Sequence, residues 1–180
     1  DFCENYTSEK DVQLSNILNP EYHLQSHGVH TYEHIRPLLV AAYASGDKRL
    51  IEALNIYISR VKSATTIAGG PIGDEWVGGR KADAGIGYEY CSIHELMASY
   101  IDLLQKTGLN EYGNSVENIF YNAGMGSRHP EKSCIAYLKT DNSYQMDGTK
   151  NGEAEPGRNQ TRYKYSPVHQ DVAVCCSPNA

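Results

Sequence analysis

The chain has 180 residues, and 40% of them are hydrophobic, which is enough to form the core of one domain of ordinary size. The formal net charge is -6, without the basic face of a nucleic-acid-binding protein. The longest apolar stretch, residues 38–44, is far shorter than the roughly 20 residues of a membrane-spanning helix. We therefore expect no nucleic-acid and no membrane partner, while compartment and oligomeric state stay open.

The spacing of apolar residues predicts two pairs of helices. The first helix runs from Ile35 to Gly46, and Asp47 can cap a second helix directly after the tight turn. A third helix stops at Gly108, and a fourth begins near Asn110. The positions expected to face the core are Ile35, Leu38, Leu39, Ala42, Tyr43, Leu50, Leu54, Tyr57, Ile58, Val61, Ile93, Met97, Tyr100, Ile101, Leu104, Tyr112, Val116, Ile119 and Phe120.

The pattern changes beyond Gly124. The segments "SCIAYLKTD" and "TRYKYS" predict short strands, and turn-rich sequence separates them. The expected fold is mainly α, with helical hairpins, long irregular loops and a few short β-strands in those loops. Such an arrangement is typical of an α/α toroid in which the loops carry the functional site.

The least usual loop is "AGGPIGDEWVGGRKADAGIG", which has seven glycines between positions 69 and 87. It does not end in the Gly-Lys-Ser/Thr of a phosphate-binding loop, and "GIGYEY" lacks the last glycine of a dinucleotide fingerprint. The loop does contain Asp74 and Glu75 beside Trp76, the only tryptophan. An indole and glycine backbone could desolvate a carboxyl and favour its protonated form, as a general acid requires. The alternative is a solvated acidic turn.

The loop leads into "YEYCSIHELM", in which Glu89 and Cys91 stand two residues apart at a helix start. Cys175 and Cys176 are adjacent, and a disulfide between them is disfavoured because consecutive Cα atoms are about 3.8 Å apart. One carboxylate and three thiolates together suit tetrahedral zinc by ligand number and softness. The alternative is that Cys91 is a small buried hydrophobe and the pair lies in a loose terminus.

Taken in order, "GDEW", "GYEYCSIHELMASYIDLLQKTGLNEYGNSVENIFYNA" and "CCSPN" resemble glycoside hydrolase family 127, the β-L-arabinofuranosidase-like group formerly called a domain of unknown function. The similarity runs with gaps from about His27 to the end of the chain. It implies an (α/α)6 barrel, of which residues 1–180 would be a partial catalytic domain, because only four strong helices are predicted.

The resemblance also implies the chemistry of the site. Glu89, Cys91, Cys175 and Cys176 would bind Zn2+, and Cys175 would be the nucleophile of a retaining mechanism. Glu75 would be the general acid/base, and the partner would be an oligosaccharide or glycoside of plant type.

Three further residues are expected to contact the sugar on the strength of the resemblance. They are His30, which fits the family pattern better, His27 and Tyr137. The sugar and its linkage stay open. The alternative function is a non-catalytic, zinc-stabilised helical scaffold that binds carbohydrate, in which the four ligands only hold the loops together.

Overall fold

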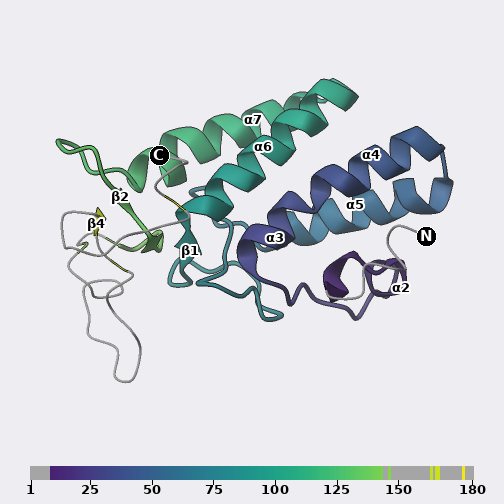
Figure 1. Cartoon of the computed structure of the whole chain (residues 1–180), viewed down its shortest axis with the longest axis horizontal. Coiled ribbons are helices and arrows are strands. Elements are labelled where there is room, and N and C mark those ends of the chain that lie inside the picture. Colours follow the sequence, from purple (N-terminus) through teal and green to yellow (C-terminus); the bar gives the residue numbers. More distant parts are fainter. Residues whose placement is uncertain (1–8, 144–145, 147–162, 164, 167–175, 177–180) are drawn as a thin grey trace.

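A computed structural model describes residues 9–143, 146, 163, 165–166 and 176 of the chain. The described part is mainly helical, as predicted, with a few very short strands (Figure 1). Its elements in chain order are η1 (Lys10–Val12), α2 (Leu14–Ile17), α3 (Gly28–Glu33), α4 (Ile35–Ser45), α5 (Lys48–Ser63), β1 (Tyr88–Glu89), α6 (Tyr90–Thr107), α7 (Asn110–Asn118), the π-helical turn η2 (Ile119–Gly124), β2 (Ile135–Ala136), β3 (Leu138–Lys139) and β4 (Tyr165–Ser166).

Both predicted helical hairpins are present. Helix α4 ends at Gly46, which has the left-handed conformation with φ of 66°, and the Asp47 side chain caps α5 by accepting a 2.8 Å hydrogen bond from the Arg49 N–H. Helix α6 ends in the same way at Gly108, with φ of 71°, and α7 begins at Asn110. These boundaries confirm the predicted ones because the stop and start signals are local.

The two hairpins are joined through α6, which packs against α3, α4 and α7. In Figure 1 the tight turns of both hairpins lie at one end of the helices, and the long loop and short strands gather at the other end. The core between the helices contains fully buried tyrosines such as Tyr32 and Tyr57. None of the helices in the described residues has both the length and the apolar character needed to cross a membrane.

Three residues expected in the core are instead exposed. Tyr43, Ile101 and Phe120 have exposed fractions of 43%, 37% and 46%. For Phe120 the reason is the switch from α7 to the π-helical η2, because a π-turn contains extra backbone and rotates later side chains away from a 3.6-residue stripe. Ala123 is buried in that turn instead.

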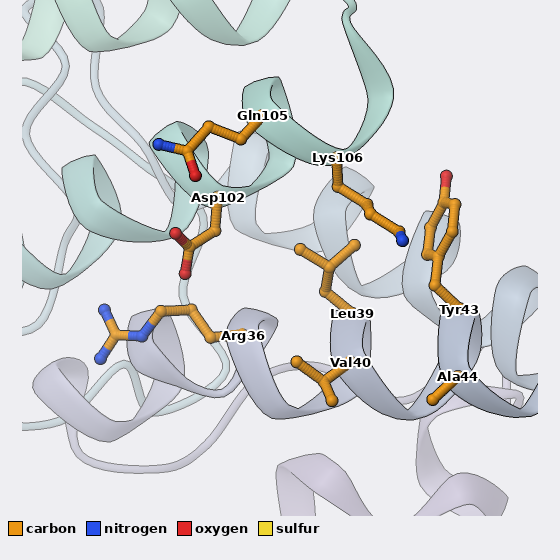
Figure 2. Close-up of a pocket in the computed structure, with 8 residues that line it drawn as sticks. All are labelled: Arg36, Leu39, Val40, Tyr43, Ala44, Asp102, Gln105 and Lys106. Atoms are coloured by element: carbon orange, nitrogen blue, oxygen red, sulfur yellow. The ribbon is translucent and has the colours of Figure 1, made fainter.

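Tyr43 belongs to a groove between α4 and α6. Figure 2 shows side chains from both helices facing each other across it, and Lys106 Nζ lies 5.0 Å from the centre of the Tyr43 ring. The groove is lined by Arg36, Leu39, Val40, Tyr43, Ala44, Asp102, Gln105 and Lys106. No residue predicted to bind metal or sugar lines it.

The predicted short strands are also present. Strand β2 pairs antiparallel with β4, and β3 pairs antiparallel with β1, a strand that periodicity did not predict. In the second pair Glu89 lies opposite Leu138. This pairing holds the start of α6 against the segment around Tyr137, and so brings Glu89 and Tyr137 to the same end of the helices.

Candidate active site

Glu89 and Cys91 are placed by the junction of β1 and α6. The Tyr90 N–H donates a 3.1 Å hydrogen bond to the Tyr137 carbonyl, which extends the β1–β3 pairing to the first residue of the helix. Glu89 then precedes α6 in an extended conformation, and Cys91 lies in its first turn. Both are buried, with exposed fractions of 1% and 3%. A carboxylate held this deep needs polar or metal partners.

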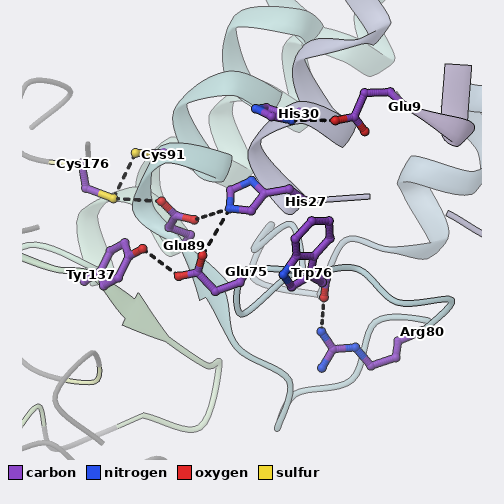
Figure 3. Close-up of polar contacts among 10 residues, drawn as sticks. All are labelled: Glu9, His27, His30, Glu75, Trp76, Arg80, Glu89, Cys91, Tyr137 and Cys176. Atoms are coloured by element: carbon purple, nitrogen blue, oxygen red, sulfur yellow. Dashed lines mark hydrogen bonds and ion pairs between the residues drawn. The ribbon is translucent and has the colours of Figure 1, made fainter. Parts of the chain in front are cut away.

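The thiols of Cys176 and Cys91 are such partners for the Glu89 carboxylate. Cys176 Sγ lies 3.0 Å from Cys91 Sγ and 3.4 Å from Glu89 Oε1, and the Cys176 side chain is fully buried (Figure 3). The three donor atoms lie within 4.8 Å of one another. One carboxylate oxygen and two sulfurs, all buried, fit the preferences of zinc, which accepts both ligand types. Cys175, the expected fourth ligand and nucleophile, lies outside the described residues.

Glu75 lies on the long loop, which is fastened to the start of α3. The Glu75 carbonyl accepts a 2.8 Å hydrogen bond from the Gly28 N–H, and Gly73 N–H donates to the Gly87 carbonyl at 2.9 Å. Glu75 has a φ of 92°, the only positive value outside glycine among the described residues. Such a conformation costs on the order of 1–3 kcal/mol and is most often found at functional sites.

Close packing explains several glycines at and near this loop. A Cβ atom on Gly70 would lie 2.2 Å from the Tyr88 ring, and one on Gly87 would lie 2.2 Å from the Tyr163 hydroxyl. A Cβ on Gly28 would come within 3.3 Å of the Gly73 carbonyl. The missing side chains therefore let the loop lie directly on β1 and on the start of α3, which brings Glu75 toward Glu89.

The Glu75 carboxylate has a partner on each oxygen. The Tyr137 hydroxyl donates a 2.7 Å hydrogen bond to Oε1, and His27 Nε2 lies 3.3 Å from Oε2. The same His27 nitrogen is 3.9 Å from Glu89 Oε2, so the imidazole lies between the two carboxylates (Figure 3). With 24% of its side chain exposed, Glu75 stays accessible to a ligand while Glu89 does not.

His27 is held in place by a residue that the sequence did not indicate. Asp11 is fully buried, and its carboxylate accepts hydrogen bonds from the backbone N–H groups of Gln25 and Ser26, each at 2.9 Å, and from the Tyr22 hydroxyl at 2.7 Å. These bonds fix the segment that enters α3, in which His27 is the N-cap residue. No local pattern around Asp11 distinguishes it from a solvated acid.

The two candidate histidines differ in position. His30 Nδ1 lies 3.1 Å from Glu9 Oε1, and 49% of the His30 side chain is exposed. Although partial burial raises the pKa of Glu9, hydrogen bonds from Ser26 and His30 outweigh it and leave that pKa lowered. The structure therefore brings His27, and not the preferred His30, to the Glu75 carboxylate.

Asp74, the other acid of the loop, has a different role from Glu75. Its Oδ1 accepts a 2.6 Å hydrogen bond from the Arg80 guanidinium, which also donates to the Trp76 carbonyl. Asp74 thus stabilises the turn and leaves Glu75 as the carboxylate that faces His27 and Tyr137.

Comparison of the sequence with protein-family models gives no match, and comparison with curated proteins finds none of significant similarity. The site must therefore be interpreted from its own geometry and from the motifs in the sequence.

Proposed function

We propose that the chain is part of a zinc-dependent retaining glycoside hydrolase that resembles family 127 and acts on β-L-arabinofuranoside-type glycosides. The observation that carries the proposal is the position of Glu75. Its partly exposed carboxylate is oriented by Tyr137 and His27 and lies next to the buried cluster of Glu89, Cys91 and Cys176. A group that can exchange a proton thus lies beside Glu89, which in turn contacts Cys176, the residue after the proposed nucleophile.

In the proposed reaction the Cys175 thiolate attacks the anomeric carbon, and the bond to the leaving oxygen breaks. Glu75, in its protonated form, donates its proton to that oxygen. In the second step Glu75 accepts a proton from water, whose oxygen attacks the anomeric carbon and displaces Cys175 as a thiolate. The Tyr137 hydroxyl and His27 orient the Glu75 carboxylate in both steps.

Glu89, Cys91 and Cys176, with Cys175, are the residues that would hold zinc. When bound, the ion would keep these thiols deprotonated at neutral pH and tie the end of the chain to the start of α6. In this proposal Cys176 and Cys91 are ligands only, because the first cysteine of the pair is the nucleophile.

A second candidate is a non-catalytic scaffold that binds carbohydrate. It is favoured by the donor set itself, since structural zinc sites commonly have four protein ligands and no open position. In that case Glu75 would contact sugar without transferring a proton, and Cys175 would never be alkylated by substrate.

The decisive experiment uses the full-length protein and the Glu75→Gln variant. We expect Glu75→Gln to lose turnover of aryl and sugar furanosides by at least about a thousandfold while its zinc content stays at the wild-type value. Glu117→Gln, on the exposed face of α7, is a matched control that should retain full activity. Wild-type turnover by Glu75→Gln would rule out the assignment.

Labelling separates the two candidates. A furanosyl electrophile directed at the nucleophile should modify Cys175 in the wild-type protein, as peptide mass spectrometry can show. If Cys175 remains unmodified at every concentration while zinc and sugar both bind, the scaffold is the better description.

A further inference from the structure

Trp76 is the only tryptophan of the chain, and it directly follows Glu75. The side chain is 60% exposed, although a large aromatic ring would gain most from burial. Its indole lies edge-on to the His27 imidazole, with ring centres 5.7 Å apart and planes at 88°. In Figure 3 the indole lies next to the His27 ring, while the Glu75 carboxylate points away from the indole toward Tyr137 and His27. A wide apolar face is therefore left open to solvent next to the proposed general acid.

The exposure of Trp76 does not come from a loosely held backbone. Trp76 forms an isolated antiparallel bridge with His27, and its carbonyl accepts a hydrogen bond from the Arg80 guanidinium. The next residue, Val77, is fully buried and donates a 3.0 Å hydrogen bond to the Ser26 carbonyl. Backbone hydrogen bonds thus hold the chain in place at Trp76 and at the next residue. An exposed ring on a backbone that is already ordered loses less entropy when a ligand binds.

The side of the site on which Trp76 lies follows from the chemistry. A general acid must be within hydrogen-bond reach of the leaving oxygen, so the leaving group lies on the Glu75 side of the scissile bond. Trp76 directly follows Glu75, and its indole lies against His27, which contacts the Glu75 carboxylate, so the ring borders the part of the site that a leaving group held by Glu75 would occupy. The exposed C–H face of a sugar ring is flat and apolar enough to stack on an indole.

We propose that Trp76 is an aromatic platform for the sugar ring of the leaving group, so that the substrate class is a disaccharide or longer glycan and not a glycoside of a small alcohol. The inference rests on the proposed function for its geometry, since Glu75 defines the leaving-group side. The binding part of it can be tested without turnover.

The first test is the tryptophan emission of the inactive Glu75→Gln variant of the full-length protein, measured beside the same variant with Trp76→Phe so that the part that comes from Trp76 is isolated. The probes are α- and β-linked pentose and hexose disaccharides, each paired with the methyl glycoside of its non-reducing sugar. We expect at least one disaccharide to shift the Trp76 emission with saturation and to bind at least tenfold more tightly than its methyl glycoside. If no disaccharide changes the emission, or if both members of every pair bind equally, the platform is wrong.

The second test measures kcat/KM of Trp76→Ala and Trp76→Tyr on the same pairs. Trp76→Ala should lose about tenfold on the disaccharide, mainly in KM, and less than twofold on the methyl glycoside, while Trp76→Tyr restores most of the loss. Tyr43→Ala, an exposed aromatic at the hairpin-turn end of α4, should match the wild-type protein on both probes. Equal losses on both probes would overturn the platform.

The two proposals fail in different ways. If the wild-type protein hydrolyses the disaccharide and Trp76→Ala does so equally well, the platform fails and the glycosidase stands. If no probe is hydrolysed but a disaccharide shifts the Trp76 emission, the glycosidase fails and the platform stands as a sugar-binding surface.

Discussion

Cys91 and Cys176 are 85 positions apart in the chain, yet their Sγ atoms lie 3.0 Å from each other in a fully enclosed pocket. Cys176 Sγ is also 3.4 Å from the buried Glu89 carboxylate. A thiol can donate a weak hydrogen bond to a carboxylate, and two thiols with one carboxylate are also a donor set that suits a single zinc ion. The first prediction follows from this contact.

The proposed site binds one zinc ion per chain, and Cys91→Ser should lower the zinc content of the full-length protein well below that value, because a serine hydroxyl is a poor ligand for zinc. A strong chelator should lower the melting temperature of the wild-type protein by roughly 10 °C, the loss expected for a tightly bound ligand of a domain this size. The same chelator should hardly change the melting temperature of Cys91→Ser. Metal analysis and thermal unfolding measure both effects.

Cys134→Ser is the matched control for that prediction. Cys134 is also buried, but it is not part of the cluster of Glu89, Cys91 and Cys176. Its substitution should leave the zinc content at one ion per chain. Equal zinc loss in both cysteine variants would mean that the loss reflects general destabilisation and not a missing ligand.

Tyr137→Phe should reduce kcat by about tenfold with little change in KM, because it removes the 2.7 Å hydrogen bond that orients Glu75 Oε1. A tenfold effect corresponds to about 1.4 kcal/mol, near the lower end for a hydrogen bond to a charged group. The melting temperature and zinc content should stay unchanged, since the Tyr137 carbonyl still pairs with Tyr90. Tyr43→Phe serves as the control, and unaltered kcat in Tyr137→Phe would show that Tyr137 does not position Glu75.

The parts of the fold that could be predicted are those fixed by neighbouring residues. The end of α4 at Gly46 and the Asp47 cap of α5 depend on backbone conformations and hydrogen bonds within a few positions. Phe120 could not be placed by the same reasoning, because the π-helical turn changes the periodicity on which the expectation depended. Whether the helical hairpins belong to a barrel stays a prediction.

The candidate site, like the fold, contains some residues that local motifs indicate and others that they do not. Motifs in the sequence indicated Glu75, Glu89 and Cys91, since each stands in an unusual local pattern. Asp11 could not be found in this way, because its role depends on the backbone N–H groups of Gln25 and Ser26, which only the folded chain brings to it. Long-range pairing, here of β1 with β3, is what the sequence alone does not reveal.

Gly70→Ala should destabilise the protein by about 1–3 kcal/mol, the usual cost of forcing an extra carbon into a filled interior. The new Cβ would lie 2.2 Å from the ring of Tyr88, which is itself fully buried and has no room to move. Gly113→Ala is the matched control within α7, because its Cβ would meet only Leu104 Cδ2, at 3.5 Å. That control should stabilise the protein by about 0.5–1 kcal/mol, since alanine is the better helix former.

Urea unfolding of both glycine variants measures these changes in the free energy of unfolding. The critical result is that Gly70→Ala has a lower free energy of unfolding than Gly113→Ala. A Gly70→Ala protein as stable as the wild type would mean that the glycine-rich loop does not lie against Tyr88 as described.

His34 gives the fold a dependence on pH. Burial lowers the pKa of His34 below its usual 6.5, and the charge of His30 lowers it further, whereas Glu9 and Asp11 oppose the shift. Because the pKa is lower in the folded state, the unfolded chain binds more protons just below 6.5. The free energy of unfolding should therefore fall as the pH decreases from 6.5 toward the folded-state pKa of His34. Above 6.5 this contribution is constant.

His34→Gln should flatten that part of the pH profile, since the amide has no proton to gain in this range. Urea unfolding at about pH 7.5 and at about pH 5.5 compares the two sides of the transition, and both values lie above the range in which carboxylates usually titrate. His23→Gln, at an exposed position before α3, is the control and should retain the wild-type slope. An equal slope in His34→Gln and the wild type would show that protonation of the buried imidazole is not what destabilises the fold in acid.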